Sequence, residues 1–337
     1  MYSLNRRDRK LYKKIAVVTG CSGFIGTTFT RVLLEKGWTV YGIDMLTYVA
    51  NDIDMSWLLT SYPDNYIVIK DDIKDIDRLP ECDVVFNLAA ESDVDNSILS
   101  VDKFIDSNIS GVKNLLEIIT HKSVQIKNNK PLFFQVSTDE VYGDTLEGSF
   151  DETTALMPSN PYAATKAAAD MLIESWSRTH GLDYIIARPS NNYGENQYPE
   201  KLIPTAVRRL QRGKKIKLHN KGLPIRSWTH VEDTAEAFIL LYEKACRNNI
   251  YNIQSDYEQT NIVTVKKIIN AYFMGDINVE IPDYDEHISY EYDRPGQDVR
   301  YSISCESIKN YGWTPKKNFD KEIVKLVNYY KKRKWVW

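Results

Sequence analysis

A chain of 337 residues, of which 43% are hydrophobic and 26% charged, is long enough for two lobes and too apolar for extended disorder. Its 43 Lys and Arg nearly balance 46 Asp and Glu, so no global charge draws it to nucleic acid or an anionic membrane. No apolar run approaches the roughly 18 residues of a membrane span, and no signal peptide is visible. The four cysteines match no zinc spacing. We therefore expect a cytoplasmic protein without a metal, nucleic-acid or membrane partner.

The first structural pattern follows a basic N-terminal tail, residues 1–14, which we expect to be solvated. Residues 15–19 form an apolar β-branched run, glycines follow, and residues 27–36 have a helical pattern. A second strand is expected over residues 39–43, ending at Asp44. Together they predict a βαβ unit of about 30 residues.

Strand and helix patterns continue to alternate along the chain. This alternation predicts an α/β fold with a Rossmann-type, doubly wound parallel sheet that is covered by helices on both faces. Further strands are expected over residues 66–69, 84–88, 132–136, 184–187 and 250–253, and helices over residues 112–119, 163–178 and 235–245.

Beyond Arg188 the chain becomes rich in proline, aromatic residues and polar loops. We expect this half to form mostly a smaller substrate-binding lobe, with one segment returning to the sheet. The expected domains are a dinucleotide-binding domain over residues 15–190, with a returning segment at about 228–255, and a C-terminal lobe over residues 191–227 and 256–337.

A glycine-rich turn joins the first strand to the first helix. Gly20, Gly23 and Gly26 have GxxGxxG spacing, which lets backbone amides and a helix N-terminus hold a pyrophosphate. Asp44, at the end of the next strand, suits a ribose 2′-hydroxyl and repels a 2′-phosphate. The pattern predicts NAD rather than NADP. Further cofactor-binding candidates in this turn and at later strand ends are Phe24, Ile25, Asp72, Ile73, Ala89 and Ala90.

Tyr162 and Lys166 are four residues apart at the start of an expected helix, so both side chains project from one face. A lysine ammonium beside a phenol is expected to lower the phenol pKa from about 10 toward the working pH. This pair is weak evidence in a chain with 22 tyrosines, and it gains meaning from the glycine turn upstream.

The segment STDEVYG, residues 137–143, directly follows the strand expected over residues 132–136. Thr138 offers a hydroxyl to a substrate, and Asp139 and Glu140 can divide acid and base duties if their environments separate their pKa values. Taken alone, the same pair also fits a solvated turn.

At this point the chain resembles the extended short-chain dehydrogenase/reductases, and among them the nucleoside-diphosphate-glucose 4,6-dehydratases. The Thr-Asp-Glu triplet of residues 138–140 is the most specific feature, because related epimerases carry small or neutral residues in place of the carboxylates. The resemblance covers nearly the whole chain through TGCSGFIG (19–26), NLAAESDVDNS (87–97), STDEVYG, YAATK (162–166), RPSNNYGENQYPEKLIP (188–204), IRSWTHVEDTAEA (225–237) and RPGQDVRY (294–301).

The resemblance implies a three-stage reaction on one bound NAD. Tyr162, assisted by Lys166 and Thr138, deprotonates the 4-hydroxyl while hydride leaves carbon 4 for the nicotinamide. Glu140 then removes the proton on carbon 5 as Asp139 protonates the departing 6-hydroxyl. Hydride finally returns to carbon 6, so the cofactor ends oxidised.

The resemblance also assigns residues to the nucleotide sugar, and these make residues 191–227 and 256–337 a nucleotide-sugar-binding lobe. The guanidinium groups among them suit a diphosphate because their planar fork pairs with phosphate oxygens. Tyr301 either stacks near the nucleobase or packs in the core. The candidate substrate-binding residues are Ser92, Thr138, Asn192, Glu200, Lys201, Leu202, Arg226, Arg294 and Tyr301.

Three questions stay open on the sequence alone. UDP-glucose is favoured over dTDP-glucose as the substrate, which would place the enzyme in deoxysugar synthesis such as that of rhamnose. The alternatives are a nucleotide-sugar 4-epimerase or decarboxylase, and a non-catalytic NAD-binding module. We also expect a homodimer, because the apolar-faced helices over residues 112–119 and 163–176 fit a four-helix interface.

Overall fold

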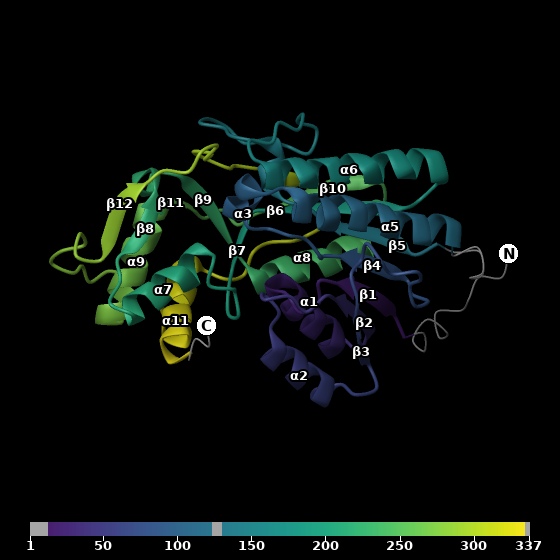
Figure 1. The fold of residues 1–337 in the computed structure, drawn as a ribbon, viewed down its shortest axis with the longest axis horizontal. Helices are drawn as coiled ribbons and strands as arrows, with labels where there is room; N and C mark the ends of the chain where they lie inside the picture. Colours follow the sequence, from purple (N-terminus) through teal and green to yellow (C-terminus); the bar gives the residue numbers. More distant parts are fainter. Residues whose placement is uncertain (1–12, 123–129, 334–337) are drawn as a thin grey trace.

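A seven-stranded, all-parallel sheet forms the centre of the protein in this computed structural model, which describes residues 13–122 and 130–333 (Figure 1). The strand order is β10-β6-β5-β4-β1-β2-β3, so the chain winds outward from β1 in both directions. The Rossmann-type sheet expected from the sequence is confirmed. Its strands are β1 (Ile15–Thr19), β2 (Thr39–Asp44), β3 (Tyr66–Lys70), β4 (Val84–Asn87), β5 (Leu132–Val136), β6 (Tyr184–Pro189) and β10 (Asn249–Ile253).

Helices bury both faces of the sheet. Successive strand residues point to opposite sides, so each strand contributes side chains to both layers. Val18 packs with Phe29 of α1 (Phe24–Glu35) and Phe238 of α8 (Val231–Lys244). Val17 points the other way, toward Leu115 of α5 (Val112–Glu117) and Ile173 of α6 (Pro161–His180). This two-sided burial explains why the strands are nearly continuous apolar runs.

Shorter helices complete these two layers. α2 (Asp52–Ser61) and α10 (Glu306–Lys309) contribute to the core on the α1 side, whereas α3 (Val94–Leu99) contacts α6 on the other. The helix expected over residues 112–119 is the middle of a longer run: α4 (Asp102–Phe104), a π-helical stretch (Ile105–Gly111), α5, and a second π-helical stretch (Ile118–Lys122). No helix in the described part of the chain is long and apolar enough to cross a membrane.

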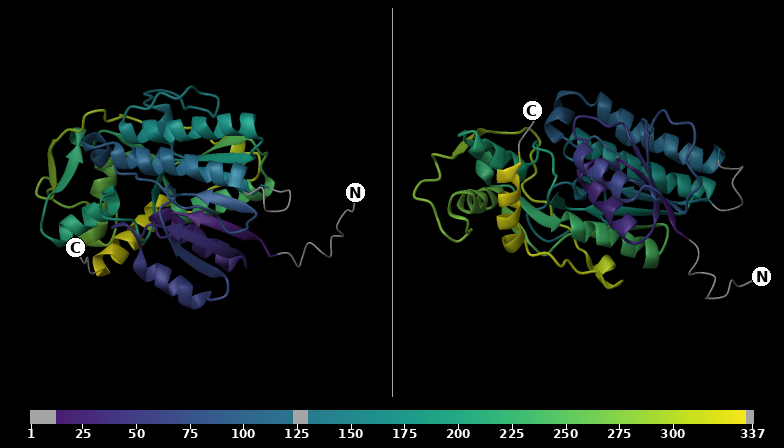
Figure 2. Two further views of the ribbon diagram at one scale, coloured as in Figure 1. Left: turned by 45° about the vertical axis from the view of Figure 1, so that its right-hand side comes forward. Right: turned by 90° about the horizontal axis from the view of Figure 1, so that it is seen from below.

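The second lobe lies beside the carboxyl ends of the central strands (Figures 1 and 2). It contains a sheet of β11 (Glu258–Thr260), β9 (Ile225–His230) and β7 (Asn191–Tyr193), and the pair β12 (Ile288–Tyr292) and β8 (Ile216–His219). Its core is shared by α7 (Leu202–Gln211), α9 (Asn261–Met274) and α11 (Phe319–Lys332).

The structure departs from the sequence expectations in the second lobe and in the segment that returns to the sheet. The three helices of the second lobe were not predicted, although α9 carries Val265, Ile268 and Ile269 at helical spacing on its buried face. The segment at about 228–255, which was expected to return to the central sheet, does so only in part. Its α8 and β10 join the central layers, whereas β9 belongs to the small sheet. The basic N-terminal tail lies outside the described residues except for Lys13 and Lys14.

Candidate active site

The glycine turn between β1 and α1 is tightly closed. Gly20 has a φ of +66°, and a Cβ there would lie 2.7 Å from the amide nitrogen of Ala89. A Cβ on Gly26 would lie 1.9 Å from the carbonyl oxygen of Gly20, so only glycine lets α1 approach the turn. The first residues of α1, Phe24 to Gly26, line a cavity, as a pyrophosphate site at a helix N-terminus requires.

Asp44 lies at the end of β2 beside this turn. Its carboxylate accepts hydrogen bonds from the backbone amides of Ser22, at 2.9 Å, and Leu46, at 2.8 Å. Burial raises its pKa from the usual value, and these two bonds act in the opposite direction. A cavity of about 120 Å³ opens in front of it, and the predicted cofactor residues Gly20, Gly23, Asp44, Asp72, Ile73, Ala89 and Ala90 all line it.

A second cavity of about 270 Å³ adjoins the first and contains the proposed chemistry. Both cavities are lined by Gly20, Gly23, Ala90 and Ser92, so one extended ligand can occupy them together. The second cavity is lined by the predicted cofactor residues Phe24, Ile25 and Gly26 and by all five predicted catalytic residues, Thr138, Asp139, Glu140, Tyr162 and Lys166.

Tyr162 and Lys166 project from the first turns of α6, which begins at Pro161 after the N-cap Asn160. Lys166 Nζ donates to the carbonyl oxygen of Val136, at 2.7 Å, and burial lowers its pKa to about 8. The expected lowering of the Tyr162 pKa is not found in the protein alone. Burial and then the charge of Glu140 raise it, and a hydrogen bond with Thr138 only partly offsets this.

The two carboxyl groups after β5 have different environments. Asp139 is 3% exposed, and burial followed by the charge of Glu140 raises its pKa to about 8. Its Oδ2 has no hydrogen-bond partner among the described residues. Glu140 is only half-buried, and its Oε2 accepts a hydrogen bond from the Asn160 amide at 3.3 Å and lies 3.3 Å from the Tyr301 hydroxyl. The pair therefore offers an acid that is neutral at pH 7, Asp139, next to a more exposed carboxyl group that accepts a hydrogen bond.

Asn160 and Tyr301 were not predicted from the sequence as neighbours of Glu140. Asn160 was not identified from the sequence, although an Asn before Pro161 is a recognisable helix N-cap. Tyr301 was assigned to the nucleobase or to core packing, and the structure buries its ring beneath the Arg226 guanidinium, at 4.2 Å. Its hydroxyl donates to Asp298, at 2.5 Å, which fits the packing interpretation.

Several predicted substrate residues meet at the cavity mouth. Lys201 pairs with Glu200 at 3.1 Å and donates to the backbone oxygen of Ser92 at 2.9 Å. Asn192 lines the same cavity, and its buried Oδ1 has no partner in the described part of the chain. Such an orphaned acceptor is suited to a substrate hydroxyl.

Four predicted substrate residues line neither cavity: Tyr301, described above, and Arg226, Arg294 and Leu202. Arg226 donates to the carbonyl oxygens of Ile225 and Asp298, and Arg294 pairs with Asp95 through its Nε at 2.6 Å. Leu202 is the first residue of α7. Their contacts with a substrate stay predictions.

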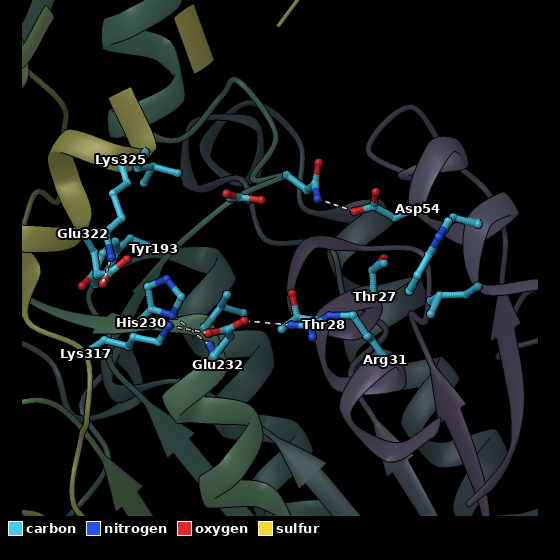
Figure 3. A pocket seen from close by; sticks show the side chains of 16 residues that line it. Thr27, Thr28, Arg31, Asp54, Tyr193, His230, Glu232, Lys317, Glu322 and Lys325 are labelled. Carbon is cyan, nitrogen blue, oxygen red and sulfur yellow. Dashed lines mark hydrogen bonds and ion pairs between the residues drawn. The ribbon is translucent and has the colours of Figure 1, made fainter. Parts of the chain in front are cut away.

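A third cavity, of about 410 Å³, lies between α1 and α2 on one side and α8 and α11 on the other (Figure 3). Its cations are already paired, Arg31 and Lys317 with Glu232 and Lys325 with Glu322. It shares no lining residue with the other two cavities, and its balanced charges indicate no particular ligand.

A doubly wound parallel sheet with this glycine turn, and a Tyr-Lys pair on the helix after β5, defines the class of extended short-chain dehydrogenase/reductases. The sequence pattern of the GDP-mannose 4,6 dehydratase family matches residues 17–326. The chain belongs to this family, and the resemblance to nucleotide-sugar 4,6-dehydratases is confirmed.

Individual relatives agree with this assignment. A dTDP-glucose 4,6-dehydratase of Salmonella typhimurium is 38% identical over 93% of this chain and 92% of its own length. The low-salt glycan biosynthesis protein Agl12 of Haloferax volcanii is 36% identical over 93% and 97%. The crystal structure of DesIV, a dTDP-glucose 4,6-dehydratase of Streptomyces venezuelae with NAD bound, superposes with a TM-score of 0.86 at 32% identity over 94% and 97%. The two relatives named here as 4,6-dehydratases are dTDP-glucose enzymes, so they do not support the expected preference for UDP-glucose.

Proposed function

We propose that the protein is an NAD-dependent dTDP-glucose 4,6-dehydratase that produces the 4-keto-6-deoxy sugar nucleotide. The observation that carries this proposal is the placement of Asp139 and Glu140 in one cavity with Tyr162 and Lys166, with the two carboxyl groups in different environments. A 4-epimerase needs the Tyr-Lys pair and the cofactor but has no task for a buried neutral acid. The names of the relatives favour dTDP over UDP.

The cofactor site fits NAD on the geometry of this chain. The turn around Gly20 and Gly26 has no room for a Cβ, and the Asp44 carboxylate lines the adjoining cavity where a ribose 2′-hydroxyl would bind. When bound, NAD would accept and return hydride, and its positively charged ring would lower the pKa of Tyr162.

The protein's own groups account for the proton transfers. Tyr162, hydrogen-bonded by Thr138, takes the proton of the 4-hydroxyl. Glu140 takes the proton of carbon 5, which the new ketone has acidified. Asp139 is protonated at neutral pH because its pKa is about 8, and it gives its proton to the departing 6-hydroxyl. The orphaned Oδ1 of Asn192 is placed to accept a hydrogen bond from the sugar.

Three variants test the assignment of roles. Asp139→Asn is expected to retain oxidation at carbon 4 and exchange of the carbon 5 proton with solvent deuterium, while water loss stalls. Glu140→Gln should retain oxidation, and the rate of carbon 5 proton exchange should fall by about 100-fold to 10,000-fold. Tyr162→Phe should abolish both signals. If both carboxyl variants dehydrate at the unmodified rate, the pair is a solvated turn and the epimerase alternative replaces this proposal.

The substrate and cofactor are tested directly. Turnover of dTDP-glucose and UDP-glucose is compared by the mass change for lost water, and a faster reaction with UDP-glucose would reverse the nucleotide assignment. The nucleotide released on denaturing the purified protein should be NAD, since the Asp44 carboxylate would repel a 2′-phosphate. Recovery of mainly NADP would contradict the role of Asp44.

We also propose a homodimer in the cytoplasm. Leu99 of α3 and Met171 of α6 are 82% and 56% exposed, and their helices contact each other on one face of the molecule. These side chains extend the interface expected from α5 and α6, where Leu115 and Ile173 are buried against the sheet and Leu172 and Trp176 are partly buried. The four cysteines are all free thiols, in keeping with a reducing compartment.

A further inference from the structure

Two oppositely charged side chains are buried beneath the active-site cavity, and no step of the proposed reaction uses them. Asp170 is 0% exposed and Arg188 is 1% exposed, and Arg188 Nε lies 3.0 Å from Asp170 Oδ2. Desolvation opposes such a pair, and apolar residues of similar volume often stabilise a fold as well or better. Stability alone therefore does not account for it.

The ion pair contacts both ends of residues 137–142, which we call the catalytic turn. The hydroxyl of Ser137 donates to Asp170 Oδ2 at 2.9 Å, so one carboxylate oxygen holds the start of the turn and the guanidinium together. At the other end, Arg188 Nη1 donates to the Tyr142 hydroxyl at 2.7 Å and lies over the Tyr142 ring. Tyr142 in turn donates to Asn252 of β10 at 2.9 Å.

The same pair fixes the turn to the helix that carries the Tyr-Lys pair. Asp170 lies one helical turn beyond Lys166 on α6, and its charge raises the Lys166 pKa, which burial lowers. Lys166 itself donates to Val136, immediately before Ser137. The first residue of the catalytic turn is therefore attached to α6 by its side chain and by the neighbouring backbone.

The carboxyl groups within the turn are weakly held by their own contacts. Asp139 has a hydrogen bond of 3.3 Å from Thr138 to one oxygen, and the other oxygen has no partner among the described residues. Within the described part of the chain, the side-chain contacts of Glu140 are the two at 3.3 Å with Asn160 and Tyr301. Their positions depend on the backbone that supports them.

We propose that the buried Asp170–Arg188 ion pair is a positioning device that clamps the catalytic turn against α6 and so sets Asp139 and Glu140 relative to Tyr162. This inference rests on the proposed function, which assigns elimination to these two carboxyl groups. It makes Ser137, Tyr142, Asp170 and Arg188 positioning residues rather than catalytic ones.

Two conservative variants cut the clamp at either end and leave the ion pair in place. Tyr142→Phe keeps the ring under the guanidinium and removes one hydroxyl, and Ser137→Ala removes the other. Tyr251→Phe is the matched control, because this buried tyrosine of β10 donates to the carbonyl of Cys246 at 3.0 Å and lines neither active-site cavity. In holoenzyme with dTDP-glucose, deuterium exchange at carbon 5 and water loss should fall about tenfold in the clamp variants, the equivalent of one net hydrogen bond. Oxidation at carbon 4, followed by absorbance, should fall less than exchange and water loss, because Tyr162 and Lys166 are carried by α6 and only Thr138 of this step lies in the turn.

A second measurement does not depend on turnover. Carbon-13 NMR of aspartate-labelled, cofactor-free protein reports the titration of Asp139, with Asp139→Asn identifying its signal. A loosened turn admits water, so the pKa of Asp139 should fall from about 8 in both clamp variants and stay unchanged in Tyr251→Phe.

The outcomes separate the two proposals. Unmodified dehydration by Asp139→Asn and Glu140→Gln would overturn the proposed function. If those variants fail to dehydrate and the clamp variants match Tyr251→Phe in exchange and in the Asp139 titration, the clamp is overturned. An equal loss of oxidation and exchange in the clamp variants would also overturn it, because a general structural role would affect both stages.

Discussion

Replacing Asp139 with Asn should stabilise the protein at neutral pH while it abolishes water loss. In the folded chain the Asp139 pKa is raised from 3.8 to about 8, mainly by burial. A carboxyl group with a raised pKa contributes stability that is fully present below the unfolded value and is lost as the pH rises through the folded value. Between these two pKa values, each pH unit lowers the free energy of unfolding of the wild type by about 1.36 kcal/mol. Asn cannot ionise and does not incur this cost.

The free energy of unfolding of the variant should therefore rise relative to wild type by about 2 to 3 kcal/mol between pH 5 and pH 7. Urea denaturation of the cofactor-free chain, followed by tryptophan fluorescence at pH 5, 6 and 7, measures the difference. Asp64→Asn, at an exposed position, controls for the loss of one charge. If the difference between Asp139→Asn and wild type stays constant within about 0.5 kcal/mol, Asp139 is not held neutral by the fold and its role as the acid loses its basis.

Three further predictions test other parts of the molecule. Water elimination should fall at least about tenfold per pH unit above about pH 8, because Asp139 loses the proton it donates and Lys166 loses its charge; a rate that keeps rising to pH 9.5 would contradict this. Gly26→Ala should destabilise the chain by at least about 2 kcal/mol in urea denaturation and weaken NAD binding in calorimetry, since its Cβ would meet a backbone oxygen at 1.9 Å; unchanged values would show that α1 can shift. Leu99→Asp should convert the proposed dimer to a monomer in sedimentation at micromolar concentration, whereas Ile53→Asp, on exposed α2, should not; a persistent dimer would move the interface elsewhere.

Local patterns in the sequence determined the parts of the protein that depend on neighbouring residues. The unit from Ile15 to Asp44 was predicted nearly to its observed ends, because an apolar run, a glycine turn and an amphipathic helix each leave a local signature. The strand Leu132–Val136 was predicted with its observed bounds. Tyr162 and Lys166 were predicted from their helical spacing together with the glycine turn upstream.

The second lobe was harder because its local signals conflict. Its helices are short segments among prolines and aromatic residues, and α7 has Pro204 in its first turn, where a proline is tolerated. Their apolar faces form a core only when α7, α9 and α11 meet, and those contacts join residues far apart in the chain.

Only the tertiary structure decided the environments of the catalytic groups. Asp139 and Glu140 are adjacent in sequence, yet one is fully buried and the other meets Tyr301, which is 161 residues away. The Asp170–Arg188 pair joins α6 to β6, and the motif that begins at Arg188 does not indicate that Asp170 is its partner. Burial and long-range hydrogen bonds set pKa values and positions, and they arise only when distant segments pack together. The sequence therefore identified the candidate catalytic residues, and the packing around them supplies the different environments on which the proposed acid and the proposed clamp depend.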